Sequence, residues 1–267
     1  MKIKMHSAYK HFPDREPEEG EAYINCYNDI NCMTEDIAPN SIALLIEPRS
    51  IFPMVYDWMA IHYKKFKYVF THDSILLNNC DNSKRILYGG GFGGISEYQI
   101  TTKSKEISLC SSHKTLCELH YARTHLAEVL KDSLVVDTMG TFDGGEYVSA
   151  DKIYQDYRFS IAIENYIDDW WFTEKICNCF ANKTIPIYVG ARKIDKLFNP
   201  DGIIHCVNVL DVMSRIELID PSSWRDIYQQ KLGAVLDNYR LVKKYARFED
   251  WFFAEYGELL EEMRSST

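Results

Sequence analysis

The segment YRFSIAIENYIDDWWFTEKICNCFANKTIPIYVGA (residues 157–191) carries polar side chains at positions where an α/β protein can do chemistry. Its first apolar run, Phe159 to Ile163, ends directly in Glu164 and Asn165. A short apolar run of this kind predicts a buried strand. In open parallel sheets, ligands bind beyond the carboxyl ends of the strands. The carboxylate and the amide are therefore placed to contact a ligand.

A helix is predicted to begin shortly afterwards, at Thr173, Glu174 and Lys175. Thr173 is a good N-cap, because its hydroxyl can accept a hydrogen bond from a backbone N–H of the first turn. The partial positive charge of a helix N-terminus favours Glu174 and disfavours Lys175. A bound phosphate would remove this conflict, since backbone N–H groups, the helix dipole and the ammonium could all contact it. The alternative is a solvated surface lysine.

Two further kinds of side chain suit a nucleotide. Arg123 falls within a predicted helix, and a guanidinium can bind phosphate through two parallel hydrogen bonds; an ordinary surface ion pair is its alternative. Trp170, Trp171 and Phe172 could stack on a flat base, or they could pack together in a core or at an interface.

The composition is that of an ordinary globular protein, with 267 residues, 46% hydrophobic and 26% charged. A net charge of −9 argues against a nucleic-acid partner, because such proteins carry a basic surplus. No run approaches the roughly 20 apolar residues that span a bilayer, and the N-terminus lacks the apolar centre of a signal peptide. We therefore expect a cytoplasmic protein without a stable membrane span.

Eight cysteines are present, and their spacing does not suggest a disulfide framework. Cys110, His113, Cys117 and His120 could share one helix face, but a structural zinc site usually pairs its ligands across a longer turn. We therefore favour a half-buried helix face over a metal site.

Strands that alternate with helices predict two α/β layers with parallel sheets. The first layer has strands at 42–46 and 68–70 around a helix at 54–63. A polar break at 101–106 predicts a domain boundary. After it come a strand at 107–110, a helix at 116–130, the segment 157–191, and a mostly helical tail from residue 222. We expect an N-terminal, acceptor-side α/β domain over residues 1–103 and a C-terminal, nucleotide-sugar-binding α/β domain with a helical tail over residues 104–267.

The segment 157–191 and its neighbours resemble a known family. YRFSIAIEN…TEKICNCFANKTIPIYVGA resembles the donor-binding motif of the α-1,3-fucosyltransferases, glycosyltransferase family 10, and its Glu-Asn to Glu-Lys spacing fits that motif. KEISLCSSHKTLCELHYARTHLAEVL followed by VVDTMG is similar to the segment that contains the family's phosphate-binding arginine. FNPDGIIHCVNV and NYRLVKKYARFEDWFF resemble its C-terminal part. The resemblance extends over roughly residues 107–253.

The resemblance implies a GT-B fold, with two Rossmann-like α/β domains facing a cleft and a helical C-terminal tail. It implies an inverting glycosyltransferase that moves a sugar, usually fucose from GDP-fucose, to a hydroxyl of an acceptor glycan. Its partners would be a nucleotide-sugar donor and that glycan. No cofactor or metal is required, because cationic side chains and a helix end can replace a metal ion.

The resemblance also implies roles for single residues. Arg123 and Lys175 would bind the diphosphate, and Glu174 and Asn165 would hold ribose or fucose hydroxyls. Trp171 would lie near the base, where the family often has an aromatic residue.

Glu164 and Thr173 complete the expected donor-binding set. A general base is expected in the N-terminal domain, where family members have a Glu after a buried strand. Glu47, in LLIEPRS, is our candidate, although a proline follows it at once; a surface loop carboxylate is its alternative. His72 and Asp73 are the backup candidates.

Other functions stay open. YGGGFGG contains a Gly-x-Gly-x-x-Gly pattern at Gly89, Gly91 and Gly94, as in NAD-dependent oxidoreductases, but no convincing helix follows it. The chain could also be a non-catalytic nucleotide- or sugar-binding module, or a transferase that uses another nucleotide-sugar.

Overall fold

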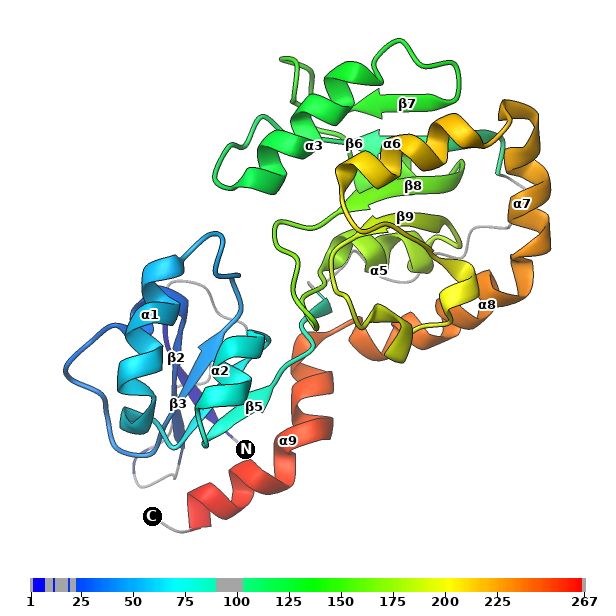
Figure 1. The fold of residues 1–267 in the computed structure, drawn as a ribbon. Coiled ribbons are helices and arrows are strands. Elements are labelled where there is room, and N and C mark those ends of the chain that lie inside the picture. Colours follow the sequence, from blue (N-terminus) through cyan, green and yellow to red (C-terminus); the bar gives the residue numbers. More distant parts are fainter. Residues whose placement is uncertain (1, 8–11, 13–18, 20–22, 90–102, 266–267) are drawn as a thin grey trace. The chain divides into compact units, whose positions relative to one another are not determined.

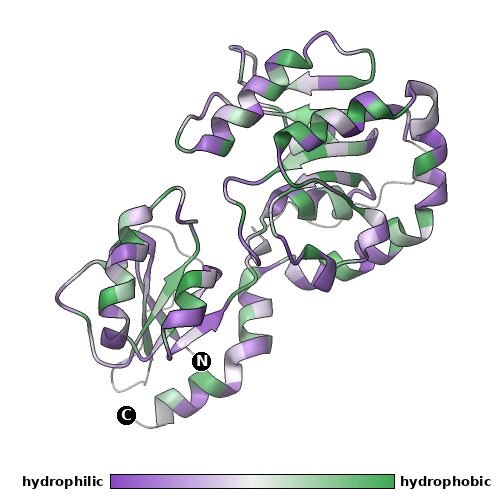
Figure 2. Ribbon diagram, in the orientation of Figure 1, coloured by the Kyte–Doolittle hydropathy of each residue, from purple (hydrophilic) through white to green (hydrophobic). Residues whose placement is uncertain are grey.

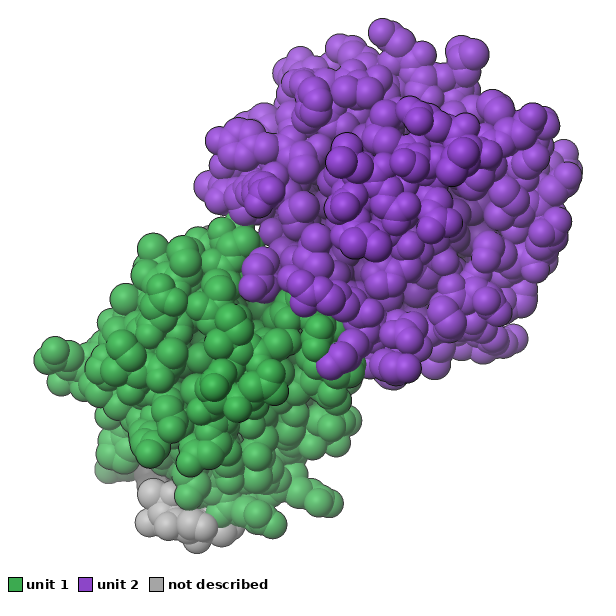
Figure 3. All heavy atoms as spheres, in the orientation of Figure 1, with its two compact units in different colours: residues 1–88, 168–171, 247–267 green, residues 89–167, 172–246 purple. Residues whose placement is uncertain are grey.

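The computed structural model describes residues 2–7, 12, 19, 23–89 and 103–265. The chain divides into two compact units (Figure 3). Unit 1 comprises residues 1–88, 168–171 and 247–267, and unit 2 comprises residues 89–167 and 172–246.

Unit 1 contains a parallel five-stranded sheet in the order β1-β2-β3-β4-β5 (Figure 1). The strands are β1 (Ile3–His6), β2 (Ile24–Asn28), β3 (Ser41–Leu45), β4 (Tyr68–Thr71) and β5 (Ser83–Arg85). The helices of the unit are α1 (Pro53–His62), α2 (Ser74–Asn79) and α9 (Phe248–Ser265).

Alternating residues of β3 enter two different cores of unit 1. Ile42 and Leu44 pack in a cluster with Phe248 and Phe252 of α9. Ala43 and Leu45 pack in a second cluster that includes residues of α1 and α2. Since successive strand residues point to opposite faces, the sheet has α9 on one face and α1 with α2 on the other.

Unit 2 contains a second parallel five-stranded sheet, in the order β10-β9-β8-β6-β7. Its strands are β6 (Lys105–Cys110), β7 (Val136–Met139), β8 (Tyr157–Ile163), β9 (Ile185–Val189) and β10 (Ile204–His205). Its helices are α3 (Glu118–Val129), α4 (Ala150–Tyr154), α5 (Glu174–Ala181), α6 (Val209–Leu218), α7 (Trp224–Gln230) and α8 (Leu232–Leu241).

The outer helices of unit 2 carry both apolar and polar residues along their length (Figure 2). In α6, for example, Val212 and Ile216 are buried in the core while Leu210 is exposed. One apolar stripe therefore suffices to hold such a helix on the sheet.

The predicted strands and helices of the motif are confirmed. The strand at 185–189 has the predicted bounds, and β8 contains the predicted strand at 159–163 with two more residues at its start. The α/β class with two parallel sheets is also confirmed.

The division of the chain differs from the expected one at 103/104. Unit 2 begins at Gly89, and residues 90–102, with two of the three motif glycines, lie outside the described residues. Residues 247–267 belong to unit 1, although we placed the helical tail in the C-terminal domain. The physical reason is the apolar stripe of α9, including Phe252 and Leu260, which packs into the core of unit 1.

Candidate functional site

Unit 2 contains a cavity of about 280 Å³ at the carboxyl ends of its central strands. The last residues of β6 and β8, Cys110 and Ile163, both line it, as does Gly140, which follows β7. This is the edge at which parallel sheets bind ligands.

Three of the residues that the sequence pointed to line this cavity. They are Arg123 from α3, and Glu174 and Lys175 from the first turn of α5. The fold thus brings together two cations and one carboxylate from segments about fifty residues apart.

Thr173 is the N-cap of α5, as predicted, and its hydroxyl accepts a hydrogen bond from the backbone N–H of Lys175 at 3.5 Å. Its position is fixed by Glu164, which is fully buried. Glu164 accepts hydrogen bonds from the backbone N–H and the hydroxyl of Thr173, at 2.8 and 2.7 Å. The carboxylate after β8 therefore supports the helix start, although we expected it to face a ligand.

Lys175 is surrounded by oxygen atoms. Its ammonium lies 3.0 Å from the Thr173 hydroxyl and 3.3 Å from a carboxylate oxygen of both Glu164 and Glu174. Burial lowers the pKa of Lys175, but the carboxylates of Glu174 and Glu164 outweigh it, so the pKa is raised overall. Lys175 is therefore a permanent cation at the N-terminus of α5.

Arg123 is 92% buried, with 8% of its surface exposed, and it has fewer partners than its five donors allow. One N–H group donates to the backbone oxygen of Ile163 at 2.9 Å, and Nε has no hydrogen-bond partner among the described residues. Burial lowers the pKa of Arg123, with Glu164 acting against that change. A buried cation with an unused donor would gain from an anion in the cavity.

Asn165 is oriented by His120 of α3. His120 Nδ1 accepts a hydrogen bond from the backbone N–H of Leu116 at 3.2 Å, so the proton of the neutral ring is on Nε2. Nε2 therefore donates to the Asn165 side-chain oxygen, at 3.0 Å. Burial and the charge of Arg123 lower the pKa of His120, which keeps the ring neutral.

The two tryptophans pack against side chains of unit 1. Trp171 belongs to unit 1 with only 3% of its surface exposed, and its ring packs against His72 with 4.3 Å between centroids. Trp170 lies under the guanidinium of Arg85 at 4.1 Å. Trp171, which we expected near the base, is not among the residues that line the cavity with Arg123 and Lys175.

Glu47 lies just beyond the carboxyl end of β3, and it is exposed. Its backbone is held on two sides: its N–H donates to Asp29 at 3.1 Å, and its oxygen accepts from the hydroxyl of Tyr56 at 2.5 Å. Asp29 follows β2 and also accepts from the backbone N–H of Ile46. Burial raises the pKa of Asp29 to about 7, against the effect of these hydrogen bonds.

The two backup candidates, His72 and Asp73, are both almost fully buried. Asp73 caps α2 and forms a two-pronged ion pair with Arg49, at 3.0 and 3.1 Å. Structural contacts thus occupy the carboxylate of Asp73. Among these carboxylates, only Glu47 is exposed at a strand end.

The roles of three residues at these sites were not predicted from the sequence. Asp29 directly follows β2, so a carboxylate at a strand end was a signal that could have found it. His120 and Asn178 are buried positions of amphipathic helices, where the sequence pattern does not distinguish them from core residues. Asn178 lies one turn after Lys175 and lines the same cavity.

Within the residues that the structure describes, no group of three or more His, Cys, Asp or Glu is arranged to hold a metal ion. In the same part of the chain, every helix is too short or too polar to cross a membrane.

Two solved structures show that the fold of this chain is a known one. A crystal structure of an α1,3-fucosyltransferase with GDP aligns with a TM-score of 0.55 and 16% identity, over 88% of this chain and 77% of that chain. The crystal structure of TarM aligns with a TM-score of 0.57 and 12% identity, over 89% of this chain and 54% of that chain. Together with the two parallel sheets, these alignments establish a GT-B fold.

The sequence of unit 2 matches a family model and a curated relative. The model of the family described as "Glycosyltransferase family 10 (fucosyltransferase) C-term" matches residues 100–220. The curated α-(1,3)-fucosyltransferase FucT of Helicobacter pylori is 39% identical over 64 residues, which are 24% of this chain and 13% of that protein. Residues 100–220 of this chain are thus similar to the C-terminal domain of glycosyltransferase family 10.

Proposed function

We propose that the chain is an inverting glycosyltransferase that moves fucose from GDP-fucose to a hydroxyl of an acceptor glycan. One observation carries this proposal: within the family 10 domain, Arg123 and Lys175 face one cavity at the N-terminus of α5. Two cations beside a helix N-terminus suit the diphosphate of a nucleotide-sugar. The fucosyltransferase structures with GDP and with GDP-fucose support this choice of donor.

In the proposed reaction, the acceptor oxygen attacks the anomeric carbon of fucose while the bond from that carbon to the diphosphate breaks. Glu47 takes the proton of the acceptor hydroxyl, as a general base does. Arg123 and Lys175 stabilise the negative charge that develops on the leaving GDP. These fixed positive charges can act where other transferases use a metal ion, so the proposed mechanism includes no cofactor.

The remaining residues bind or support. We assign Glu174 and Asn165 to hydroxyl groups of ribose or fucose, with Asn165 oriented by His120. Glu164 and Thr173 act indirectly, because their hydrogen bonds position the ammonium of Lys175. Trp171, which is buried in unit 1, has no direct contact with the donor in this proposal.

Calorimetric titration of the protein with GDP, UDP, ADP and NAD tests the proposal. We expect GDP to bind selectively, and Lys175→Ala to weaken that binding at least about tenfold, as the loss of a charged hydrogen bond implies. Lys196→Ala is the matched control, because its side chain is 67% exposed and pairs with Asp195 on the surface. GDP binding that survives in Lys175→Ala would refute the phosphate assignment.

The other titrations separate the remaining functions. Binding of UDP or ADP in place of GDP would retain the transferase but replace its donor. Binding of NAD would favour an oxidoreductase that uses the glycine-rich segment. If GDP binds but fucose is transferred to no glycan and GDP-fucose is not hydrolysed, a non-catalytic binding module is the better description.

A further inference from the structure

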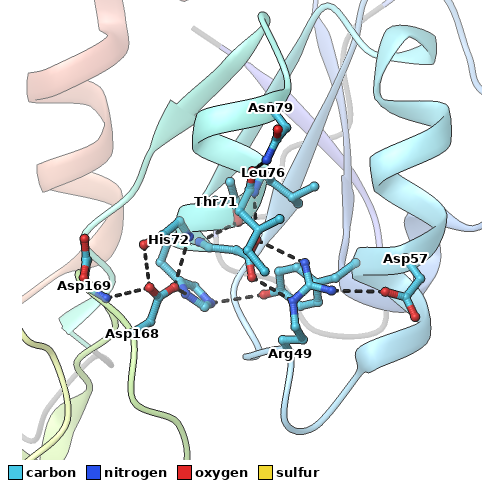
Figure 4. A network of polar contacts seen from close by, with 12 residues as sticks. Arg49, Asp57, Thr71, His72, Leu76, Asn79, Asp168 and Asp169 are labelled. Carbon is cyan, nitrogen blue, oxygen red and sulfur yellow. Dashed lines mark hydrogen bonds and ion pairs between the residues drawn. The ribbon is translucent and has the colours of Figure 1, made fainter.

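The loop between β8 and α5 contains four residues that belong to unit 1. Residues 168–171 pack in unit 1, while the residues on either side belong to unit 2. Asp168 holds this segment: its carboxylate accepts hydrogen bonds from the hydroxyl of Ser74 at 2.5 Å and the backbone N–H of Ser74 at 3.1 Å. Figure 4 shows the Asp168 side chain pointing toward His72 at the end of β4.

The hydrogen bonds of His72 determine where its protons are. The hydroxyl of Tyr56 has one proton. Burial raises the pKa of Tyr56, so the hydroxyl keeps this proton at neutral pH. That proton is donated to the backbone oxygen of Glu47 at 2.5 Å, because a carbonyl can only accept. In the 3.1 Å contact between Tyr56 and His72, the tyrosine oxygen must therefore accept, and Nε2 of His72 must donate.

The second ring nitrogen of His72 then faces a carboxylate. Nδ1 lies 3.9 Å from a carboxylate oxygen of Asp168 and has no hydrogen-bond partner among the described residues. A neutral ring would present a lone pair to this negative charge in a site where 1% of His72 is exposed. A doubly protonated ring presents an N–H instead, within the roughly 4 Å limit of an ion pair.

Two further contacts favour the charged ring. His72 packs against the indole of Trp171 with 4.3 Å between centroids, and a cation near an aromatic face is stabilised. Burial raises the pKa of Asp168, but its contacts with His72 and Ser74 and two backbone amides outweigh this and hold the pKa at about 2. Asp168 is therefore always a carboxylate at neutral pH.

The other charged groups near His72 are already paired. The neighbouring Asp73 is bound by Arg49, whose guanidinium lies over the ring of Tyr56 at 4.9 Å. Arg49 also contacts Asp57 at 3.1 Å. The carboxylates of Asp73 and Asp57 therefore compensate the charge of Arg49. Asp168 is the carboxylate that remains as a partner for His72.

We propose that His72 is a positioning residue: as an imidazolium, it binds Asp168 and Trp171 and so fixes the loop that joins Asn165 to Thr173. The same ring donates to Tyr56, which holds the backbone of Glu47. One buried histidine thus contacts the supports of both the general base and the donor-binding loop. Its effect on donor binding rests on the proposed function, whereas its charge does not.

The charge can be measured directly. The ring nitrogens of the eight histidines can be followed by ¹⁵N NMR of the wild-type protein at about pH 7. We expect His72 to carry protons on both nitrogens, with its signals identified by their loss in His72→Gln. If that variant does not fold, their displacement in Asp168→Asn identifies them. A ring protonated on Nε2 alone would overturn the proposal.

The coupling to the donor loop is tested with GDP affinity. We expect His72→Gln and Asp168→Asn each to weaken GDP binding about tenfold. The double variant should also bind GDP about tenfold more weakly than the wild type and no more, because both changes remove the same ion pair. His125→Gln is the control, since its side chain is 78% exposed and pairs only with Glu128 on the helix surface. Additive losses in the double variant would overturn the coupling.

The NMR measurement gives a result that a purely structural role would not, because it reports the protons on the two ring nitrogens of His72. A wild-type protein that binds no GDP would refute the proposed donor, while the NMR result would still decide the charge of His72.

Discussion

The carboxylate of Glu164 accepts two hydrogen bonds from Thr173, one from its backbone N–H at 2.8 Å and one from its hydroxyl at 2.7 Å. Glu164 directly follows β8, and Thr173 is the N-cap of α5. The pair therefore closes the intervening loop at its base. Because Lys175 lies 3.3 Å from the same carboxylate, the strand end, the helix start and the cation of the candidate site form one electrostatic group.

Glu164→Gln should lower the free energy of unfolding by about 2–3 kcal/mol. The amide N–H of glutamine would face the N–H and O–H donors of Thr173, and the ammonium of Lys175 would lose one of its two neighbouring carboxylates. Urea unfolding would measure this loss. Glu174→Gln is the control: its side chain is 44% exposed, so we expect a loss below about 1 kcal/mol. Equal losses in the two variants would contradict the supporting role of Glu164.

Glu174→Gln should also separate binding from catalysis. Its carboxylate lies 3.3 Å from the ammonium of Lys175 and repels an incoming diphosphate. We expect the variant to bind GDP equally or up to about fivefold more tightly, as removal of a partly exposed charge allows. Fucose transfer should nevertheless fall, because a carboxylate that holds a sugar hydroxyl is lost. Weaker GDP binding in calorimetry would assign Glu174 to the ribose and exclude the fucose hydroxyls as its main contact.

Glu47→Gln should lower turnover by about 10²–10⁴, the usual contribution of a general base. GDP affinity should stay unchanged, because the cavity with Arg123 and Lys175 lies in unit 2. Steady-state kinetics at saturating donor would measure the change. Glu35→Gln, another exposed carboxylate of unit 1, should leave turnover at the wild-type level. Loss of donor binding in Glu47→Gln would indicate a structural role.

Local sequence signals were sufficient to predict the strands and the helix start of the donor motif. The apolar runs that became β8 and β9 and the N-cap at Thr173 depend on neighbouring residues only, so they were predicted at nearly the observed bounds. The same holds for the presence of Arg123 within α3, although its placement on the cavity came from the resemblance and not from helical spacing.

Contacts between distant segments could not be predicted. The helical pattern of α9 was clear, but it does not specify which sheet the helix covers. Trp171 shows the same limit. An aromatic residue beside a donor motif can stack on a nucleotide base or pack in a protein core, and the sequence does not distinguish the two. Its partner His72 is 99 residues earlier in the chain. Asp168 was visible only as one of two adjacent aspartates, because its partner Ser74 is 94 residues away.

Lys103 should make the stability of unit 2 depend on pH. It is 5% exposed, its ammonium donates to the backbone oxygen of Tyr154 and the hydroxyl of Thr184, and burial lowers its pKa to about 7. In an unfolded chain a lysine has a pKa of about 10.4. Between these values the unfolded state binds more protons, so the free energy of unfolding rises with pH by up to about 1.4 kcal/mol per unit. Lys103→Met should lack this rise. Urea unfolding of both proteins from about pH 7 to 9 would measure the difference, and parallel curves would show that Lys103 stays charged when buried.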